Sequence, residues 1–383
     1  MNKYSKSNIQ YPILLMLTRK VDKNDHLAGF AYNWVKKIGE KADKLYVITW
    51  QKSKKDDLPE NVEIISLPEN KIRKILVIQK YLWKTVSESD GVFAHMNPEY
   101  TILAWPYAKI FKKKIVTWYT HGSVSLKLKL VNFLTDKILT ASKESCRLKN
   151  RKKIEVVGHG IDVEYFKPEY NTNIRMNANA TNEMNPQSAI SALNRQISIV
   201  SIGRISPAKN YKILIETADI LINKENYKNL KVQIIGAPGL KSQESYFQEL
   251  KELVKEKQLQ NNIKFLGAVP HNKILPYYRN ADLFINLSET GSVDKAVLEA
   301  MACETLVLTS NEAFREILND DRLFAKNKYP LELVCKIKYL VNLDKKQKKA
   351  IYQELRKIVE NNYSLDKLTD KIILSFKQSN SNL

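Results

Sequence analysis

The sequence predicts an α/β fold built from two doubly wound domains. Apolar runs of strand length alternate with apolar residues at helical spacing along most of the chain. This plan begins near residue 13 and begins again near residue 197. A chain of 383 residues is long enough to bury two such cores. Because strands and helices alternate, each sheet is expected to be mainly parallel, with helices on both faces.

The first domain is expected to span residues 1–168. Phe30, Trp34 and Ile38 form an apolar helical stripe, and Asn97 followed by Pro98 marks the start of another helix. Its expected strands are Ile13–Thr18, Leu45–Trp50, Val62–Ser66, Val92–His95, Ile115–Thr120, Ile138–Ala141 and Ile154–Val157.

The second domain is expected to span residues 196–360. Residues 169–195 are rich in Asn, Thr, Ser and Ala, which predicts a polar linker or insertion before it. Residues 361–383 carry apolar side chains at helical spacing, which predicts a last helix. The expected strands are Ile197–Ile202, Val232–Ile235, Ile263–Leu266, Leu283–Leu287, Leu306–Thr309 and a short Leu323–Ala325.

The segment from Ala281 to Cys303 has the pattern of a strand, a turn and a helix. Thr290, Gly291 and Ser292 break the apolar run, and apolar residues then recur at helical spacing from residue 293. Backbone N–H groups at such a helix start suit a phosphate. The carboxylate of Glu299, about two turns into the helix, could accept hydrogen bonds from ribose hydroxyls. The alternative is a surface ion pair with Lys295, one turn earlier.

A second strand-to-helix loop follows Ile197–Ile202. Gly203 ends the strand, and Arg204 and Lys209 lie in the loop before a helix that begins near Tyr211. Ligands of parallel sheets bind outside the carboxyl ends of strands, and two cations there suit a diphosphate. Loop cations rarely stabilise a fold, so replacing either is expected to leave folding intact. The alternative is a solvated loop in a lysine-rich protein.

These motifs occur together in an order that resembles glycosyltransferase family 4, whose members are retaining enzymes with the GT-B fold. The second half carries GR-x4-K from Gly203, IIGAPG at 234–239, the run NNIKFLGAVPHNKILPYYRNADLFINLS at 261–288, and LEAMAC from Leu298. The first half carries ILLMLT at 13–18, WYTHG at 118–122 and GHGIDVEYFKP at 158–168. The resemblance implies two Rossmann-like domains that face each other across a cleft, with the last helix crossing back to the first domain.

The resemblance also implies an activity and roles for particular residues. We expect a glycosyltransferase of the hexosyltransferase type (EC 2.4), which moves a sugar from a nucleoside-diphosphate sugar to a glycan or lipid-linked acceptor in surface polysaccharide or glycoconjugate biosynthesis. His121, Arg204 and Lys209 are the expected catalytic residues. The expected donor-binding residues are Gly29, Gly203, Arg204, Lys209, Thr290, Gly291, Ser292 and Glu299. For His121 a backbone-capping role in its loop stays open, as does a plain turn for Gly29.

One position departs from the family pattern. The family has a glutamate eight residues before the one that matches Glu299, and that position is Gly291 here. Glu289 lies ten residues before Glu299, so its spacing differs. Contacts to the transferred sugar are therefore in question. A nucleotide-sugar epimerase of the same architecture and a non-catalytic binding protein remain alternatives.

No metal or cofactor is expected. The resemblance implies transfer without a metal, with cations of the chain facing the diphosphate. Cys146, Cys303 and Cys335 are odd in number and widely spaced, which argues against a zinc site and favours a reducing cytoplasm. The apolar runs are too short to span a membrane, and the N-terminus lacks the apolar core of a signal peptide.

The net charge of +21 is concentrated in the first domain, where residues 1–165 hold 30 Lys and Arg against 17 Asp and Glu. Lys112–Lys114, the cluster 147–153 and the amphipathic stretch 124–134 suit peripheral contact with an anionic membrane, at its inner face. A merely solvated, lysine-rich surface is the alternative. The sequence shows no nucleic-acid-binding module, so nucleic acid is not an expected partner.

Overall fold

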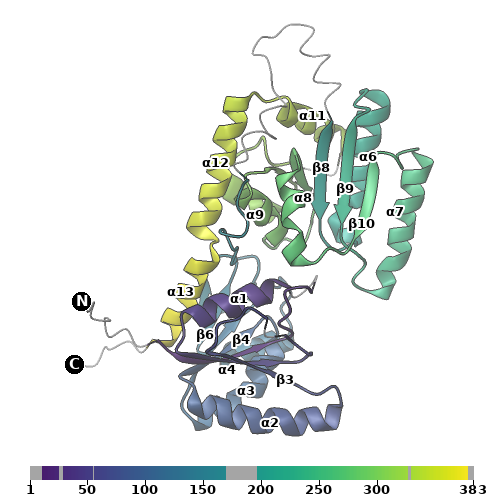
Figure 1. Cartoon of the computed structure of the whole chain (residues 1–383). Coiled ribbons are helices and arrows are strands. Elements are labelled where there is room, and N and C mark those ends of the chain that lie inside the picture. The colour runs from purple at the N-terminus through teal and green to yellow at the C-terminus, as the bar shows by residue number, and fades with distance from the viewer. Residues whose placement is uncertain (1–10, 26–28, 55, 170–195, 327–328, 378–383) are drawn as a thin grey trace. The chain divides into compact units, whose positions relative to one another are not determined.

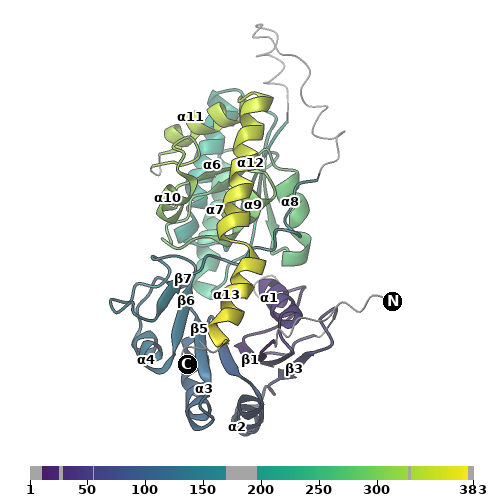
Figure 2. The same cartoon turned by 90° about the vertical axis from the view of Figure 1, so that its left-hand side faces the viewer.

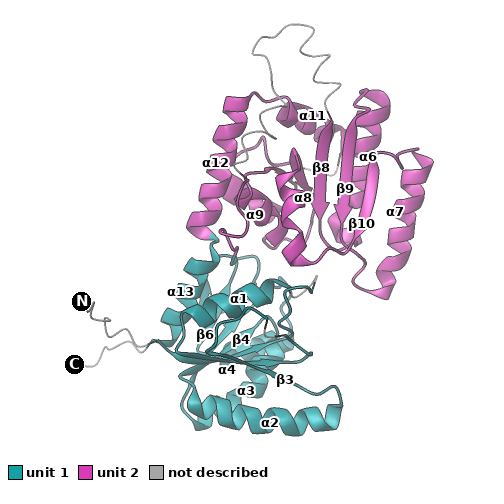
Figure 3. Cartoon of the chain, in the orientation of Figure 1, with its two compact units in different colours: residues 1–160, 363–383 teal, residues 161–362 magenta. Residues whose placement is uncertain are grey.

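The chain divides into two compact units. The computed structural model describes residues 11–25, 29–54, 56–169, 196–326 and 329–377. Unit 1 comprises residues 1–160 and 363–383, and unit 2 comprises residues 161–362 (Figure 3). Each unit holds one parallel sheet, as the sequence predicts for a pair of Rossmann-like domains.

Unit 1 alternates strands and helices, with one late helix added. Its strands are β1 (Ile13–Thr18), β2 (Lys44–Thr49), β3 (Val62–Ser66), β4 (Gly91–His95), β5 (Lys114–Trp118), β6 (Lys137–Thr140) and β7 (Ile154–Val156). Its helices are α1 (Gly29–Glu40), α2 (Lys71–Glu88), α3 (Pro98–Ile110), α4 (Leu126–Leu134) and α13 (Leu365–Phe376).

The sheet of unit 1 has the order β3-β2-β1-β4-β5-β6-β7 and is covered on both faces. Trp34 of α1 and Leu368 of α13 belong to one core cluster, while Leu82 of α2 and Ala104 of α3 belong to another. Figure 1 shows α1 on one face of this sheet and α2 and α3 on the other. Helices on both faces explain why these strands are almost entirely apolar.

Unit 2 repeats the plan with fewer strands. Its strands are β8 (Ile197–Ile202), β9 (Leu230–Ile235), β10 (Ile263–Gly267), β11 (Leu283–Asn286) and β12 (Leu306–Thr309). Its helices are α6 (Tyr211–Asp219), α7 (Glu244–Glu256), α8 (Leu275–Arg279), α9 (Lys295–Ala302), α10 (Arg315–Leu318), α11 (Pro330–Val341) and α12 (Lys345–Asn362), and α12 packs against α9 (Figure 2).

Both sheets have a point where the chain order reverses. In unit 2 the order is β10-β9-β8-β11-β12, so the reversal lies between β8 and β11. In unit 1 it lies between β1 and β4. Loops that leave neighbouring strands at such a point diverge to opposite faces of the sheet, which opens a crevice for a ligand at the carboxyl ends.

Some boundaries differ from the sequence-based expectations. Residues 161–168 belong to unit 2, so the division lies after Gly160 instead of after Pro168. The expected strand Leu323–Ala325 is a single bridge from Phe324 to Thr309, because only that pair meets the edge of the sheet. Most of the predicted linker, residues 170–195, and the last residues, 378–383, lie outside the described part of the chain.

Candidate functional site

The loop after β8 approaches the backbone of its neighbour so closely that only glycine fits. A Cβ atom on Gly236 would lie 1.9 Å from the carbonyl oxygen of Gly203, and Gly236 has φ of +147°. Tyr211, the first residue of α6, donates from its hydroxyl to that same Gly203 oxygen at 3.1 Å. These contacts fix the backbone from which the two predicted phosphate ligands, Arg204 and Lys209, project.

Arg204 is exposed and lies along the loop that follows β9. A Cβ atom on Gly239 would lie 2.7 Å from Cδ of Arg204 and 2.8 Å from its Nε, so glycine leaves room for this side chain. Gly239 of the GAPG sequence therefore leaves space for the stem and Nε of Arg204. That arrangement is compatible with the predicted contact to a diphosphate.

Lys209 lies in a different environment from Arg204. Its ammonium pairs with the carboxylate of Asp294, and the two side chains are only 14% and 17% exposed. Asn286 at the end of β11 donates to the same carboxylate oxygen at 3.0 Å. Burial by itself would raise the pKa of Asp294, but the charge and hydrogen bond of Lys209 outweigh it, and the pKa is lowered. The pair joins the loops that follow β8 and β11 at the reversal point.

A second bridge between those two loops comes from Asn210. Its side-chain amide donates to the carbonyl of Leu287 at 2.9 Å and to the carboxylate of Glu289 at 3.0 Å. Asn210 itself has φ of 52°, a left-handed conformation that asparagine tolerates. Glu289 thus has a contact that holds the loop together, and its side chain lies at the surface.

The predicted phosphate turn is present, but the helix begins later than its sequence suggests. Gly291 has φ of +63°, which favours glycine at this position. Helix α9 starts at Lys295, and Asp294 is its N-cap, with its carboxylate accepting from the N–H of Ala296 at 3.4 Å. Asp294 therefore precedes the helix, and its side chain serves both as the cap and as the partner of Lys209.

Glu299 is buried, with 6% of its surface exposed. One carboxylate oxygen accepts from the Tyr278 hydroxyl at 2.8 Å, and the other lies 2.9 Å from Nε2 of His271. Burial, followed by the charge of Glu299, raises the pKa of Tyr278 well above its usual value, so its hydroxyl stays a donor. The alternative of a surface ion pair with Lys295 does not describe this carboxylate, which tertiary contacts hold in place.

Lys295, one turn before Glu299, is half-buried at the start of α9. Burial lowers the pKa of its ammonium to about 7, and the charge of Glu299 offsets only part of that effect. Near neutral pH the charge at this end of α9 is therefore variable. Lys295 also differs from Arg204 in burial, since Arg204 is exposed.

Several residues without a role predicted from the sequence lie at this edge of the sheet. His271, Tyr278 and Asn286 hold the two carboxylates of the site. All three occur inside the long run at 261–288, yet no local pattern pairs a residue with a carboxylate 21 or 28 positions away. Only the parallel sheet brings them together.

The other two predicted residues, His121 and Gly29, lie in unit 1. Gly29 is buried and begins α1, and its N–H donates to the carbonyl of Asp25 at 2.9 Å. His121 follows β5 and is exposed beside Tyr119, with ring centroids 5.6 Å apart. His121 lines a cavity of about 770 Å³ at the carboxyl edge of the unit 1 sheet.

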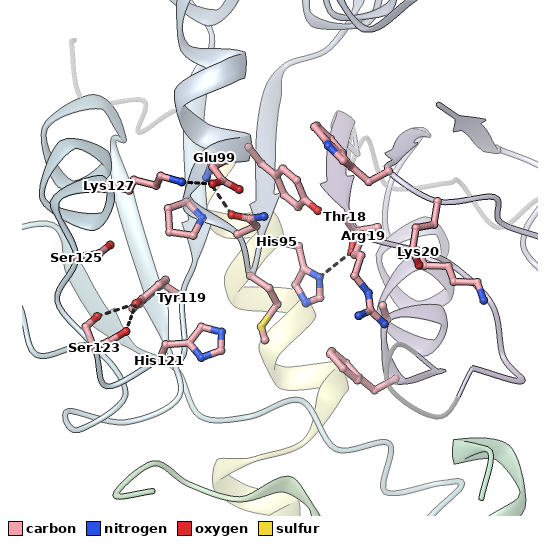
Figure 4. A pocket seen from close by; sticks show the side chains of 18 of the residues that line it. Thr18, Arg19, Lys20, His95, Glu99, Tyr119, His121, Ser123, Ser125 and Lys127 are labelled. Carbon is pink, nitrogen blue, oxygen red and sulfur yellow. Dashed lines mark hydrogen bonds and ion pairs between the residues drawn. The ribbon is translucent and has the colours of Figure 1, made fainter. Parts of the chain in front are cut away.

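This cavity, called the edge pocket here, opens at the reversal point between β1 and β4. The hydroxyl of Thr18 and Nδ1 of His95 meet at 3.0 Å across that point. Figure 4 shows Arg19 and Lys20 on one side of His95, and Tyr119 and His121 on the other. The lining residues that bear rings or charges are Arg19, Lys20, Phe30, Trp50, Lys74, His95, Glu99, Tyr100, Tyr119, His121 and Lys127.

The edge pocket combines adjacent rings with cations. The rings of Trp50 and Tyr100 lie in tilted contact with centroids 4.4 Å apart, and burial raises the pKa of Tyr100 to about 12. Lys20 pairs with Asp25 at 2.9 Å, whereas Lys74 donates to the carbonyl of Trp50 at 3.5 Å. Rings beside hydrogen-bonding groups are a common surface for sugars and other ring-bearing ligands.

Two properties of the described residues bear on metal binding and membrane insertion. No three His, Cys, Asp or Glu side chains there gather as a metal site requires. None of the helices in the same residues combines the length and apolarity needed to cross a bilayer.

The second half of the chain matches a known family. Residues 183–357 match the sequence model of the family described as glycosyl transferases group 1. The α-monoglucosyldiacylglycerol synthase of Streptococcus pneumoniae is 27% identical over 33% of this chain and 27% of its own length. The D-inositol 3-phosphate glycosyltransferase of Corynebacterium glutamicum is 29% identical over 41% of this chain and 35% of its own length. The match thus spans about a third of these relatives.

The fold has solved counterparts that extend over the whole chain. A crystal structure of HepE from Anabaena, in complex with UDP and glucose, superposes with a TM-score of 0.72 over 95% of this chain and 99% of its own, at 15% identity. This likeness confirms the expected GT-B architecture. Residues 183–357 thus match the group 1 glycosyltransferases, and the two units together have the GT-B fold.

Proposed function

We propose that this protein is a retaining glycosyltransferase that uses a nucleoside-diphosphate sugar. One observation carries the proposal: the Lys209–Asp294 pair joins the loops after β8 and β11 at the reversal point of the unit 2 sheet, and Glu299 lies on the helix that Asp294 caps. The relatives carry names of transferases, which favours transfer over the epimerase alternative. Retention of configuration is typical of the family that the chain resembles.

The chemistry at this edge is charge stabilisation. As the bond to the sugar breaks, negative charge grows on the leaving diphosphate, and cations placed there lower the barrier. Arg204 is better placed than Lys209 to neutralise the diphosphate, because Arg204 is exposed and forms no ion pair with a buried carboxylate within the described residues. Asp294 offsets the charge of Lys209, so Lys209 acts as an oriented hydrogen-bond donor more than as a net positive charge.

Glu299 has the geometry of an anchor for the nucleoside. Its carboxylate is held by Tyr278 and His271, so an incoming ribose meets an acceptor that is already oriented. Binding energy far from the reacting bond then positions the sugar. The roles of Gly29 and His121 toward the donor, and those of Thr290, Gly291 and Ser292, stay predictions from the resemblance.

We propose the edge pocket of unit 1 as the place of the acceptor, a glycan or a lipid-linked sugar, in surface polysaccharide or glycoconjugate biosynthesis. Helix α4 exposes Leu126 (82%) and Phe133 (77%) beside Lys127 and Lys129. Such a helix suits peripheral contact with an anionic membrane from the cytoplasmic side. This location and this contact rest on surface chemistry alone.

We further propose that transfer needs no metal. The supporting observation is that the loop after β8, where we propose the donor diphosphate binds, presents the exposed cation of Arg204. Activity should therefore persist in excess EDTA. Loss of activity in EDTA that manganese or magnesium restores would contradict the proposal.

The experiment that tests the transferase function is a donor screen followed by product analysis. Thermal shifts with UDP-, GDP-, ADP- and CDP-sugars should identify one base, since a ligand that binds only the folded state raises the melting temperature. With that donor, Arg204→Ala should lower kcat/KM by about 30- to 1000-fold, equivalent to about 2–4 kcal/mol. Arg322→Ala, an exposed arginine outside the predicted site, serves as the matched control.

A second candidate function follows from Gly291. With no side chain at the position of the family's first glutamate, the chain could bind a nucleotide sugar without transferring it. A clear thermal shift combined with no transfer or hydrolysis, for every donor and for membrane extracts as acceptor, would favour that binding protein over the enzyme.

A further inference from the structure

A second cavity lies at the opposite edge of the unit 1 sheet from the edge pocket. It has a volume of about 540 Å³ and opens between the ends of α3 and α4 and the start of β5. Helices α3 and α4 pack against each other, as Figure 2 shows. Five lysines line this cavity, which is called the lysine cavity here: Lys109, Lys112, Lys113, Lys114 and Lys153.

The charge of the lysine cavity is nearly uncompensated. Its one acidic lining residue, Asp136, uses a carboxylate oxygen to accept the N–H of Ile115 at 2.7 Å. Within the described residues, none of the five lysines forms an ion pair. Nearby lysines behave differently, since Lys127 pairs with Glu99 and Lys137 pairs with Glu155.

Two of these lysines are fixed by the fold. Lys153 donates to the carbonyls of Phe133 and Thr135 at 3.1 Å and 2.7 Å, where α4 ends. Lys114 donates to the carbonyl of Lys377 at 3.3 Å, just beyond α13. Lys109, Lys112 and Lys113 stand beside them. Like charges gathered around one hollow repel each other, and a bound anion with several oxygens would relieve that repulsion.

Apolar side chains beside the cavity indicate where such an anion comes from. Phe133, which lines it, is 77% exposed, and Ile110 at the end of α3 is 58% exposed. Leu130 on α4 is 45% exposed. Free phosphates would not need an apolar rim, whereas a phospholipid offers a phosphate next to acyl chains.

We propose that the lysine cavity binds the phosphate of an anionic phospholipid, with Phe133 and Ile110 entering the acyl region beside it. The inference extends the membrane contact proposed for α4 to a defined headgroup site. It concerns binding, so it does not depend on sugar transfer. It also assigns a ligand to Lys112–Lys114, which have no role in the proposed donor site.

The test compares vesicle binding of three full-length variants. Lys109→Gln/Lys112→Gln/Lys113→Gln removes charge from the cavity. Lys346→Gln/Lys349→Gln/Lys357→Gln removes the same charge from exposed positions on α12 and is the matched control. A variant with arginine at positions 109, 112 and 113 keeps the charge. Binding to phosphatidylcholine vesicles with and without phosphatidylglycerol is measured by sedimentation, and unfolding midpoints verify that all three are folded.

We expect the cavity variant to lose on the order of 100-fold in affinity for phosphatidylglycerol vesicles, since each lysine contributes about a factor of five to ten. The control should lose no more than about threefold, and the arginine variant should bind like the wild type. Equal losses in the cavity and control variants would overturn the proposal, leaving general charge and the α4 contact as explanations. Absence of wild-type binding would overturn both.

A calorimetric titration separates the two sources of phosphate. Short-chain phosphatidylglycerol should bind the wild type, and the cavity variant should not bind it. Inorganic pyrophosphate should bind at least tenfold more weakly than the lipid. Because pyrophosphate can also bind beside Arg204, only the binding that the cavity variant loses is counted. Pyrophosphate binding that is lost in the cavity variant and is tighter than that of the lipid would overturn the lipid assignment.

Discussion

The reversal points of the two sheets differ in how their charges are arranged. In unit 2, Lys209 meets Asp294, and Glu299 meets Tyr278 and His271, all with little exposure. In unit 1, the edge pocket is a hollow of about 770 Å³ lined by rings, where Glu99 and Lys127 pair at the surface with 52% and 61% exposure.

The difference bears on the proposal that unit 2 binds the nucleotide and unit 1 binds the acceptor. A buried, mutually satisfied set of charges is rigid, because moving one member leaves another unpaired in a poor solvent. Such a set suits a constant nucleotide. An open pocket with adjacent rings and exposed cations tolerates more than one pose of a ligand, which suits the proposed acceptor.

The largest expected effect is at the buried pair of unit 2. Lys209→Ala should lower the free energy of unfolding by about 3–5 kcal/mol, because Asp294 is left buried with an unpaired charge. This reverses the expectation from sequence that replacing Lys209 spares the fold. Urea unfolding at neutral pH measures it.

Arg204→Ala is the control for that experiment. Arg204 is exposed, so its replacement should change stability by less than about 0.5 kcal/mol. The double variant Lys209→Met/Asp294→Leu should recover much of the stability that Lys209→Ala loses. Equal stability of the two single alanine variants would show that the Lys209–Asp294 pair is not a buried, coupled unit.

The next effect is at Glu299. Glu299→Ala should destabilise the protein by about 1–3 kcal/mol, because the buried Tyr278 hydroxyl loses its acceptor. It should also weaken binding of the nucleoside diphosphate found in the donor screen, which calorimetry measures. Glu289→Ala, at the exposed carboxylate that contacts Asn210, should be mild in both respects. Abolished turnover in a folded Glu289 variant would show that Glu289 is the missing acid of the family.

A pH-dependent effect is expected at Lys295. Its pKa in the folded protein is about 7, below the ordinary 10.5, so the unfolded chain binds the proton more tightly between those values. The cost of charging Lys295 is therefore complete below about pH 7 and is relieved as the pH rises. Relative to Lys295→Met, wild-type stability should rise by about 1–2 kcal/mol from pH 7 to pH 9.

Urea unfolding of the wild type and of Lys295→Met from pH 7 to pH 9 gives the difference in free energy of unfolding. The contributions of other titrating groups cancel in that difference. Lys241→Met, at an exposed lysine of unit 2, is the control and should show a constant difference. A stability difference between the wild type and Lys295→Met that does not change with pH would contradict a lowered pKa of Lys295.

The smallest effect is at the surface pair of unit 1. Lys127→Ala should cost at most about 0.5 kcal/mol, since exposed ion pairs contribute little. A hydrogen bond from Lys127 lowers the pKa of Glu99, so what stability there is should fade as acid protonates that carboxylate. If Lys127→Ala lost as much free energy of unfolding as Lys209→Ala, the two ion pairs would not differ in the way proposed.

Much of the fold could be predicted because its signals are local. Strand runs such as Ile13–Thr18 and Leu306–Thr309 have the ends that the sequence indicates, and Asn97 caps α3 as Asn-Pro predicts. The start of α9 was misplaced because Val293 fits the apolar period although it precedes the cap. The bridge at Phe324 was mistaken for a strand for the same reason, since an apolar run alone does not show whether a partner strand is present.

The sequence by itself determined the two-domain α/β plan, the glycines that allow close backbone contact and the identity of the loop cations. These depend on residue type and spacing along the chain. Only the tertiary structure decided which charges meet: Lys209 with Asp294 across 85 positions, and Glu299 with His271 across 28. The physical reason is that a parallel sheet brings the ends of strands distant in sequence to one edge, and burial there makes each charge depend on its neighbour.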